Sequence, residues 1–271
     1  MRKQLTYKVD ILRPYINWVY FDYAWGVGGK VKETKVSLYA DADEMLRVMN
    51  DSCKVRAVFR LCEANSDGDD IIVDGVRLPM LRQQNAAPSL CLADFVRPLA
   101  SGNKDTVGIF ATTCPLSDSL FDKLQQSYNI KNEDPYRKML QQTLADRLAE
   151  AAAELMHLEV RRNYWGYAPE EDLSIEELHA EKFCGIRPAV GYPSLPDTSI
   201  NFLLSDLLDM KSIGIRLTES GMMTPHASVS GLFISHSEAR YFTIGKVGDD
   251  QLRDYARRRG IPVELMRRFI K

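Results

Sequence analysis

The stretch that decides the fold is DPYRKMLQQTLADRLAEAAAELMHLEV, residues 134–160. Asp134 followed by Pro135 is typical of a helix start, because aspartate caps free backbone amides and proline fits the first helical turn. A stripe of leucines then recurs every three to four residues or multiples of that spacing, at Leu140, Leu144, Leu148 and Leu155. We therefore predict a helix of roughly 25 residues, about 37 Å long, that serves as the spine of the domain.

Polar residues share one face of this predicted helix. Asp146, Glu150, Glu154 and His157 follow one another at intervals of three or four residues, which places them side by side. For Asp146, Glu154 and His157 we expect a solvated surface. We predict no metal site here, since one histidine among carboxylates lacks a tight ligand pattern.

Residues upstream of this helix predict a mixture of helix and strand. Residues 41–50 carry apolar side chains at helical spacing. Residues 55–62 (VRAVFRLC) and 70–78 (DIIVDGVRL) are rich in β-branched residues and flank the turn-forming NSDGDD, so we predict a β-hairpin.

Residues downstream add a second predicted hairpin and short helices. Ser174 and Glu177 form a capping-box pattern at the start of one helix. Residues 227–236 and 239–247 are expected to pair as strands around SHSEAR, and two basic helices, 249–259 and 263–270, follow. Strands and helices that do not alternate along the chain favour the α+β class.

Composition limits the possible functions. The 271 residues carry a formal net charge of −2 with a pI of about 6.1, so we expect neither nucleic acid nor an anionic membrane as a partner. The N-terminus lacks the apolar region of a signal peptide, and five widely spaced cysteines suggest reduced thiols, so we expect a cytoplasmic protein. The C-terminal arginines are expected to form either a solvated face or a docking surface for an acidic redox partner.

Residues 185–193, GIRPAVGYP, are the strongest candidate for a ligand site. Their two prolines and two glycines oppose regular helix and central strand and leave backbone groups free for a ligand. Arg187 offers the planar fork that matches a carboxylate, and Tyr192 adds a flat apolar face with a hydroxyl. The alternative from these residues alone is a surface crossing with a solvated arginine.

The same loop lies within a series of motifs in fixed order. VRRNYWGYAPEEDLS, GIRPAVGYP, LTES, ASVSG and QLRDYARRRG follow one another, with ANSDGDDI, LRQQ, CLADFV and LADRLAEAAAELMH upstream and YINWVYF near the N-terminus. This series closely resembles the C-terminal activation domain of cobalamin-dependent methionine synthase. The resemblance implies an α+β fold over residues 1–271: a single curved domain with a long antiparallel sheet and helices packed around its middle.

The resemblance also implies a cofactor, S-adenosylmethionine, and the residues that bind it. The implied binding residues are Asn17, Glu150, Glu181, Arg187, Pro188, Ala189, Gly191, Tyr192, Tyr241 and Phe242. In the family this module methylates oxidised cob(II)alamin with an electron from a flavodoxin-like donor. Cobalamin is therefore expected only on a partner chain, a methionine synthase. No catalytic residue and no metal ligand is assigned in this chain.

Three positions depart from the family pattern. Asn17 stands where the family has aspartate, Val190 where its loop usually has proline, and Phe242 where it has tyrosine. The loss of charge at Asn17 is expected to weaken binding about fivefold, unless Asp22 takes over that role. Val190 is expected to leave the loop less rigid.

Two functions remain open at this point. In one, the chain is the activation component of a split methionine synthase; in the other, it serves a different corrinoid protein or only senses S-adenosylmethionine. The chain holds no D-x-H-x-x-G motif, which carries the cobalt-ligating histidine in the family, and no homocysteine or folate module, so we expect it to be inactive alone.

Overall fold

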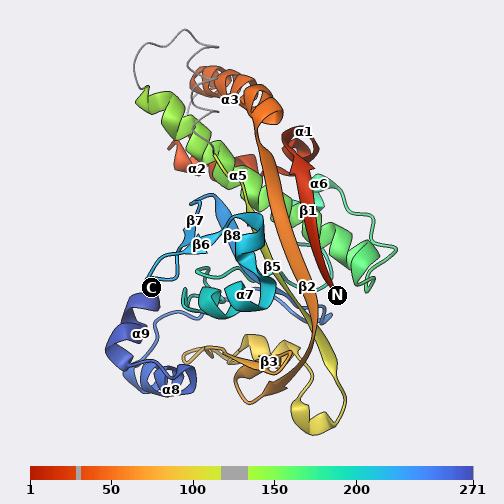
Figure 1. The fold of residues 1–271 in the computed structure, drawn as a ribbon, viewed down its shortest axis with the longest axis vertical. Coiled ribbons are helices and arrows are strands. Elements are labelled where there is room, and N and C mark those ends of the chain that lie inside the picture. The colour runs from red at the N-terminus through yellow and green to blue at the C-terminus, as the bar shows by residue number, and fades with distance from the viewer. Residues whose placement is uncertain (29–31, 117–133, 271) are drawn as a thin grey trace.

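The computed structural model describes residues 1–28, 32–116 and 134–270, and in these ranges most strands join one antiparallel sheet (Figure 1). The strand order is β4-β3-β2-β5-β8, and β1 also pairs with β2. The strands are β1 Arg2–Lys8, β2 Lys54–Asp67, β3 Asp70–Val73, β4 Val76–Pro79, β5 Asp105–Thr113 and β8 Ser228–Phe233, with a separate pair formed by β6 Arg216–Leu217 and β7 Met223–Thr224. The α+β class and the antiparallel sheet are as predicted.

The sheet is built around β2, which runs along much of the length of the molecule in Figure 1. One edge of β2 pairs with β5 from Arg56 to Ala64. The other edge takes two strands end to end, β1 along residues 54–60 and β3 along residues 64–67. This arrangement lets one long strand connect the two ends of the molecule.

Both faces of the sheet are buried. Val55, Ala57 and Phe59 of β2 belong to one hydrophobic core, whereas Val58 and Cys62 belong to the other. The alternation follows from the two-residue period of a strand. Helices α1 Val9–Leu12, α2 Trp18–Ala24, α3 Lys32–Ser52 and α5 Pro135–Glu159 contribute to the first core, and α7 Ile200–Leu208 contributes to the second.

The predicted spine helix is confirmed as α5. Its N-cap Asp134 accepts hydrogen bonds from the backbone amides of Tyr136 and Arg137, at 3.0 and 3.5 Å. The helix packs on β2, β5 and β8. It ends in a π-helical turn, η4, at Val160–Tyr164.

The remaining helical elements are short, and the last two follow β8. They are η1 Arg13–Tyr15, η2 Leu92–Phe95, η3 Leu99–Ser101, α6 Ile175–His179, η5 Met210–Ile213, α8 Asp249–Arg259 and α9 Val263–Phe269. Ser174 and Glu177 form the predicted capping box at the start of α6.

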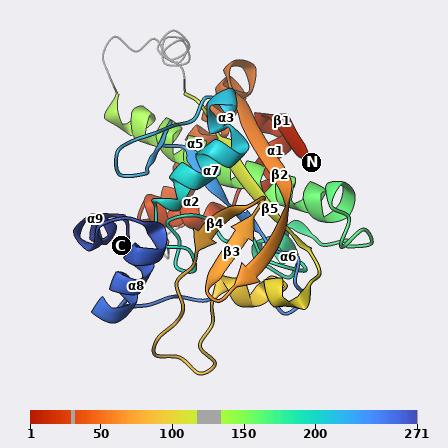
Figure 2. The same cartoon turned by 60° about the horizontal axis from the view of Figure 1, so that its bottom comes forward.

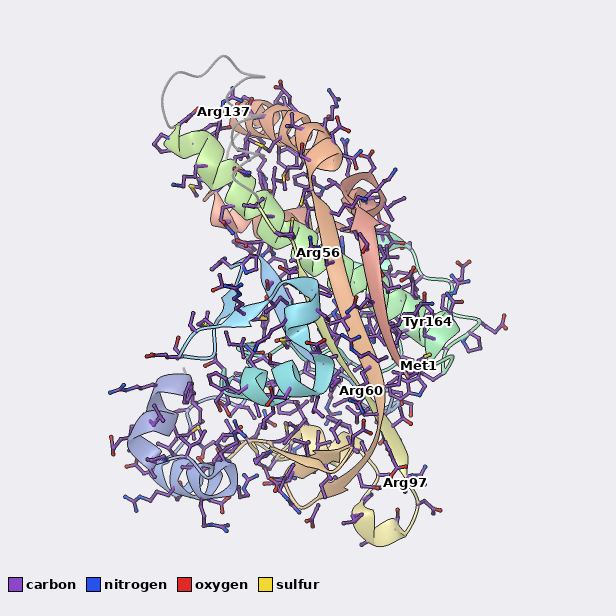
Figure 3. All side chains as sticks on the ribbon, in the orientation of Figure 1. Met1, Arg56, Arg60, Arg97, Arg137 and Tyr164 are labelled. Carbon is purple, nitrogen blue, oxygen red and sulfur yellow. The ribbon has the colours of Figure 1, made fainter. Side chains whose placement is uncertain are left out.

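Arginines of the sheet hold the ends of α7 and η5. Arg60 donates to the carbonyl oxygen of Leu207 over 3.1 Å, and Arg56 donates to that of Ile213 over 3.5 Å. Both arginines lie on β2, as labelled in Figure 3. Unpaired carbonyls at a helix C-terminus carry partial negative charge, so Arg60 fixes α7 to the sheet and Arg56 fixes η5.

The predicted first hairpin is right in outline and wrong in detail. β2 and β3 do pair, but through residues 64–67 rather than 55–62. Residues 70–78 are not one strand, because Asp74 and Gly75 have positive φ angles of 46° and 82° and turn the chain between β3 and β4. The helix predicted at residues 41–50 is part of the longer α3.

The second predicted hairpin does not form, since residues 239–247 contain no strand. The C-terminal helices do form, as α8 and α9, separated by the C-cap Gly260 with a φ of 66°. They enclose a third hydrophobic core together with Leu81 and Ile244. Figure 2 shows them beside the β3–β4 end of the sheet.

The C-terminal arginines are mostly occupied within the molecule. Arg258 pairs with Asp70 and with Asp254, and only 15% of its side chain is exposed. Arg259 donates to the hydroxyl of Ser199 over 2.8 Å. The expectation of a solvated or docking face is therefore wrong for these two arginines, which anchor α8 to the rest of the fold.

Candidate functional site

Residues 185–193, the predicted ligand loop, lie along the edge of β8 that β5 leaves free. The backbone hydrogen bonds that join loop and strand are Ile186 N to Ile234 O (2.9 Å), Ile234 N to Ile186 O (3.0 Å), Val190 N to Ser230 O (2.9 Å) and Leu232 N to Pro188 O (3.0 Å). Since β5 holds the other edge of β8, no edge remains for a strand at residues 239–247. The loop thus replaces the predicted hairpin partner.

Glycine and valine make this close approach of loop and strand possible. A Cβ atom on Gly231 would collide with the carbonyl oxygen of Pro188 and would lie 2.9 Å from the Cα of Ala189. Val190 donates its amide hydrogen to β8, which a proline could not do. The expectation of a less rigid loop therefore misses a hydrogen bond that valine adds.

The loop borders a cavity of about 560 Å³, within the size range of small-molecule sites. Its walls come from the N-terminal segment before and within α2, from α5, from α6 and the chain after it, and from residues 241–243. The lining residues are Tyr15, Asn17, Tyr20, Arg147, Glu150, Glu154, Leu178, His179, Glu181, Arg187, Pro188, Ala189, Tyr192, Pro193, Ser194, Val229, Tyr241, Phe242 and Thr243.

The cavity brings together all of the predicted cofactor-binding residues except Gly191. Gly191 has a φ of 88° and forms the turn that follows Val190. Sequence positions from 17 to 242 thus meet at one place. The role of these residues in binding stays a prediction.

Arg187 occupies one wall of the cavity and is paired with a carboxylate from α5. Its Nη2 lies 2.7 Å from Glu154 Oε2 and its Nη1 lies 3.3 Å from Oε1, so the pair is bidentate. Burial alone would lower the pKa of Arg187, but the Glu154 carboxylate outweighs it and the pKa is raised. The Arg187 backbone amide donates to the hydroxyl of Tyr241 over 2.9 Å. Arg187 is therefore held at both side chain and backbone.

The expected solvated face of α5 is wrong for two of its three residues. Glu154 is 8% exposed and His157 is fully buried. Asp146, by contrast, is partly exposed and accepts hydrogen bonds from Gln142 and His226. Glu154 turns inward because Arg187, 33 residues later, provides its counter-charge.

His157 is a neutral hydrogen-bonding group, fully buried against Arg187. Its ring stacks on Phe233 with centroids 4.8 Å apart, its Nδ1 lies 3.3 Å from Arg187 Nη1, and its Nε2 lies 3.3 Å from the hydroxyl of Tyr167. Burial, with repulsion from Arg161 and Arg187, holds the pKa of His157 well below its usual value. Because Arg187 can only donate, Nδ1 must accept and Nε2 must carry the proton.

The rest of the lining carries further polar groups, two of them acids, Glu150 and Glu181. Tyr192 donates its hydroxyl to Glu150, and Asn17 accepts from the backbone amide of Val19 over 3.1 Å, which makes it the N-cap of α2. Partial burial raises the pKa of Glu181, with Arg187 opposing and Glu154 adding to the shift. The alternative that Asp22 takes over the role of the family's aspartate is wrong, because Asp22 binds Lys35 and Tyr39 and does not line the cavity.

The two tandem aromatics lie in irregular chain rather than in a strand. Burial raises the pKa of Tyr241 to about 12, so its hydroxyl stays protonated at neutral pH. Phe242 packs near Phe95, with ring centroids 6.5 Å apart. Their position depends on contacts with the loop and with the second core.

The lining residues that the sequence prediction missed include two on helix faces, Arg147 and Tyr20. The guanidinium of Arg147 lies 5.7 Å from the ring centroid of Tyr20. A signal existed, because Arg147 and Glu150 are three residues apart on one helix face, as are Asn17 and Tyr20 at the start of α2. With Arg147 included, the lining carries three glutamates and two arginines.

The described residues offer neither a metal site nor a membrane-spanning helix. Among residues 1–28, 32–116 and 134–270, no three His, Cys, Asp or Glu side chains cluster in a way that could hold a metal ion. None of the helices in these ranges combines the length and the hydropathy that a bilayer crossing requires. All five cysteines are free thiols.

Comparison with known proteins agrees with the resemblance seen in the sequence. The family model "Vitamin B12 dependent methionine synthase, activation domain" matches residues 8–260. A solved structure, the MetH reactivation domain bound to AdoHcy, superposes with a TM-score of 0.88 at 37% sequence identity; the match covers 99% of this chain and 89% of that one. The chain therefore belongs to the family of vitamin B12 dependent methionine synthase activation domains.

Proposed function

We propose that this chain binds S-adenosylmethionine in the 560 Å³ cavity. The observation that carries the proposal is the cavity itself, which gathers the Arg187 loop, three glutamates and several aromatic side chains. S-adenosylmethionine carries a carboxylate, an ammonium and a sulfonium, a net charge of +1. A lining with one more acid than base complements that charge. The similar MetH reactivation domain was solved with AdoHcy, the demethylated form of this ligand.

We assign each part of the ligand to a wall of the cavity. Arg187 receives the carboxylate, because guanidinium and carboxylate form two parallel hydrogen bonds. Glu150 and Glu181 stabilise the ammonium and the sulfonium. The part of residues 187–192 that lines the cavity meets the edge of the adenine ring, and Tyr192, about half exposed, forms the rim.

We further propose that the bound ligand serves reductive methylation of cobalamin carried by a separate methionine synthase chain. One methyl group from S-adenosylmethionine and one electron from a flavodoxin-like donor convert cob(II)alamin to methylcobalamin and leave S-adenosylhomocysteine. Family membership supports this role. The absence of a D-x-H-x-x-G motif from the 271 residues supports a cobalamin carrier outside them. We place the protein in the cytoplasm, where its free thiols stay reduced.

The test reconstitutes the reaction. A methionine synthase without its own activation domain is loaded with cobalamin, held as cob(II), and mixed with S-adenosylmethionine and a flavodoxin reducing system. The methylcobalamin spectrum should appear only when this chain is added, and Arg187→Ala should suppress it. Calorimetry with S-adenosylmethionine tests binding separately. Binding without methylation of the cognate partner would refute the split-enzyme role and favour a sensor or another corrinoid partner.

A further inference from the structure

In the described residues, the guanidinium of Arg187 donates hydrogen bonds from one side only. Three contacts are made: Nη1 to Glu154 Oε1 at 3.3 Å, Nη2 to Glu154 Oε2 at 2.7 Å, and Nη1 to His157 Nδ1 at 3.3 Å. An arginine has five N–H donors. Glu154 accepts one hydrogen from Nη1 and one from Nη2, at the end of the guanidinium, and His157 accepts the second hydrogen of Nη1. In the parts of the chain that the structure describes, no group accepts from Nε or from a second hydrogen of Nη2.

The two remaining donors form a second edge of the guanidinium. Nη1 lies on the same side as Cδ, so Nε–H and the outer Nη2–H point in the same direction. This edge has the spacing that a carboxylate matches with two parallel hydrogen bonds. Arg187 can therefore bind a ligand carboxylate without releasing Glu154.

The groups that hold Arg187 are themselves fixed. Glu154 and His157 both belong to α5, the most extensively packed helix of the fold. His157 is stacked on Phe233 and bonded to the hydroxyl of Tyr167, which in turn donates to the carbonyl oxygen of Cys184 over 3.3 Å. A guanidinium held in this way loses little further freedom when a ligand arrives.

We propose that Glu154 and His157 are positioning residues, which hold the Arg187 guanidinium so that its Nε–Nη2 edge remains for the carboxylate of the ligand. The inference rests on the proposed function, since it needs Arg187 to bind S-adenosylmethionine. It has a direct rival: Glu154 is a competitor that the ligand must displace. The two ideas predict opposite effects of removing the Glu154 carboxylate.

The test compares two ligands and two variants by calorimetry. Glu154→Gln removes the charge, and Glu154→Asp keeps the charge but moves it away from Arg187. Each should weaken S-adenosylmethionine binding about tenfold, because charged hydrogen bonds are lost or misplaced. Decarboxylated S-adenosylmethionine lacks the group that Arg187 would bind. The affinity of each variant for this second ligand should therefore fall by less than about twofold. Asp146→Asn, a carboxylate on the same helix outside the cavity lining, is the matched control and should bind both ligands as wild type does.

A second comparison shows whether Glu154 acts through Arg187. In an Arg187→Ala background, Glu154→Gln should cause no further loss of S-adenosylmethionine affinity. If the Glu154 variants lose equal affinity for both ligands, the effect is a general structural one and the inference is overturned. Unchanged or tighter S-adenosylmethionine binding by Glu154→Gln, the result expected if Glu154 competes with the ligand, would also overturn it. Failure of the wild-type protein to bind S-adenosylmethionine would instead reject the proposed function, and the inference with it.

Discussion

Two arginine–glutamate pairs lie near the ring of Phe183 and differ in their surroundings. Arg187 pairs with Glu154 beside the cavity, and 14% of its side chain is exposed. Arg161 pairs with Glu171 over 2.7 Å, and none of its side chain is exposed. The two guanidinium carbons lie 6.0 and 4.4 Å from the Phe183 ring centroid, respectively.

An arginine–glutamate ion pair thus joins two segments at one place and borders the cavity at the other. The Arg161–Glu171 pair is closed off from solvent and joins the end of α5 to the connector after it, where Glu171 also accepts from the backbone amide of Cys184. The Arg187–Glu154 pair keeps one edge for a ligand. A sealed ion pair offsets its desolvation only while both partners remain, whereas a pair beside a cavity can also be solvated by water and can add contacts to a ligand.

The largest expected effect is on stability, at the sealed pair. Arg161→Ala leaves Glu171 buried without its counter-charge and should lower the free energy of unfolding by about 3–5 kcal/mol. Arg162→Ala, at the neighbouring exposed position, should change it by less than about 0.5 kcal/mol. Urea denaturation measures both. Equal changes in the free energy of unfolding would contradict a stabilising role for the buried pair.

The next effect is on binding, at the pair beside the cavity. Arg187→Ala should weaken S-adenosylmethionine binding by a factor of roughly 30 or more, because it truncates one partner of a buried charged contact. Its unfolding free energy should fall by less than that of Arg161→Ala, since water entering the cavity can solvate Glu154. Wild-type affinity in calorimetry would show that Arg187 does not receive the carboxylate.

His157, which lies between the two arginines, should make stability depend on pH. The folded protein holds the pKa of His157 well below the unfolded value of about 6.5, so below pH 6.5 only the unfolded chain takes up this proton. Its contribution therefore destabilises the protein by about 1.4 kcal/mol per pH unit as the pH falls from 6.5 toward the folded pKa.

The measurement is the difference in unfolding free energy between wild type and His157→Gln from pH 8 to pH 5. Arg161, Arg187 and Tyr167, the ionisable groups that act on the ring, are unchanged in the variant, so the difference isolates the histidine. Parallel curves for the two proteins would refute this assignment.

The smallest effect is expected at Asn17, which also lines the cavity. Asn17→Asp restores a charge beside the ligand and should tighten S-adenosylmethionine binding about fivefold. Aspartate also caps helices well, so α2 should keep its N-cap. Asp22→Asn, which changes a carboxylate outside the cavity lining, should leave the affinity unchanged. Weaker binding by Asn17→Asp would show that the existing acids already satisfy the ligand's positive charge.

The sequence by itself determined the elements that local rules govern. The cap at Asp134 and the leucine stripe located α5, and Ser174 with Glu177 located α6, because capping and helical periodicity act within a few residues. The motif series identified the family and the positions that meet in the cavity. β5 was not predicted, since a strand buried on both faces lacks the alternation that marks a half-buried strand.

Only the tertiary structure decided how these elements face one another. Glu154 and His157 share a face with Asp146, yet they are buried because Arg187 and Phe233 lie against that part of α5. Residues 239–247 have strand-like composition but no partner, because the loop at 186–190 already occupies the edge of β8. In both cases the deciding contact comes from a distant part of the chain. Periodicity and capping cannot encode that contact, because they depend only on near neighbours in sequence.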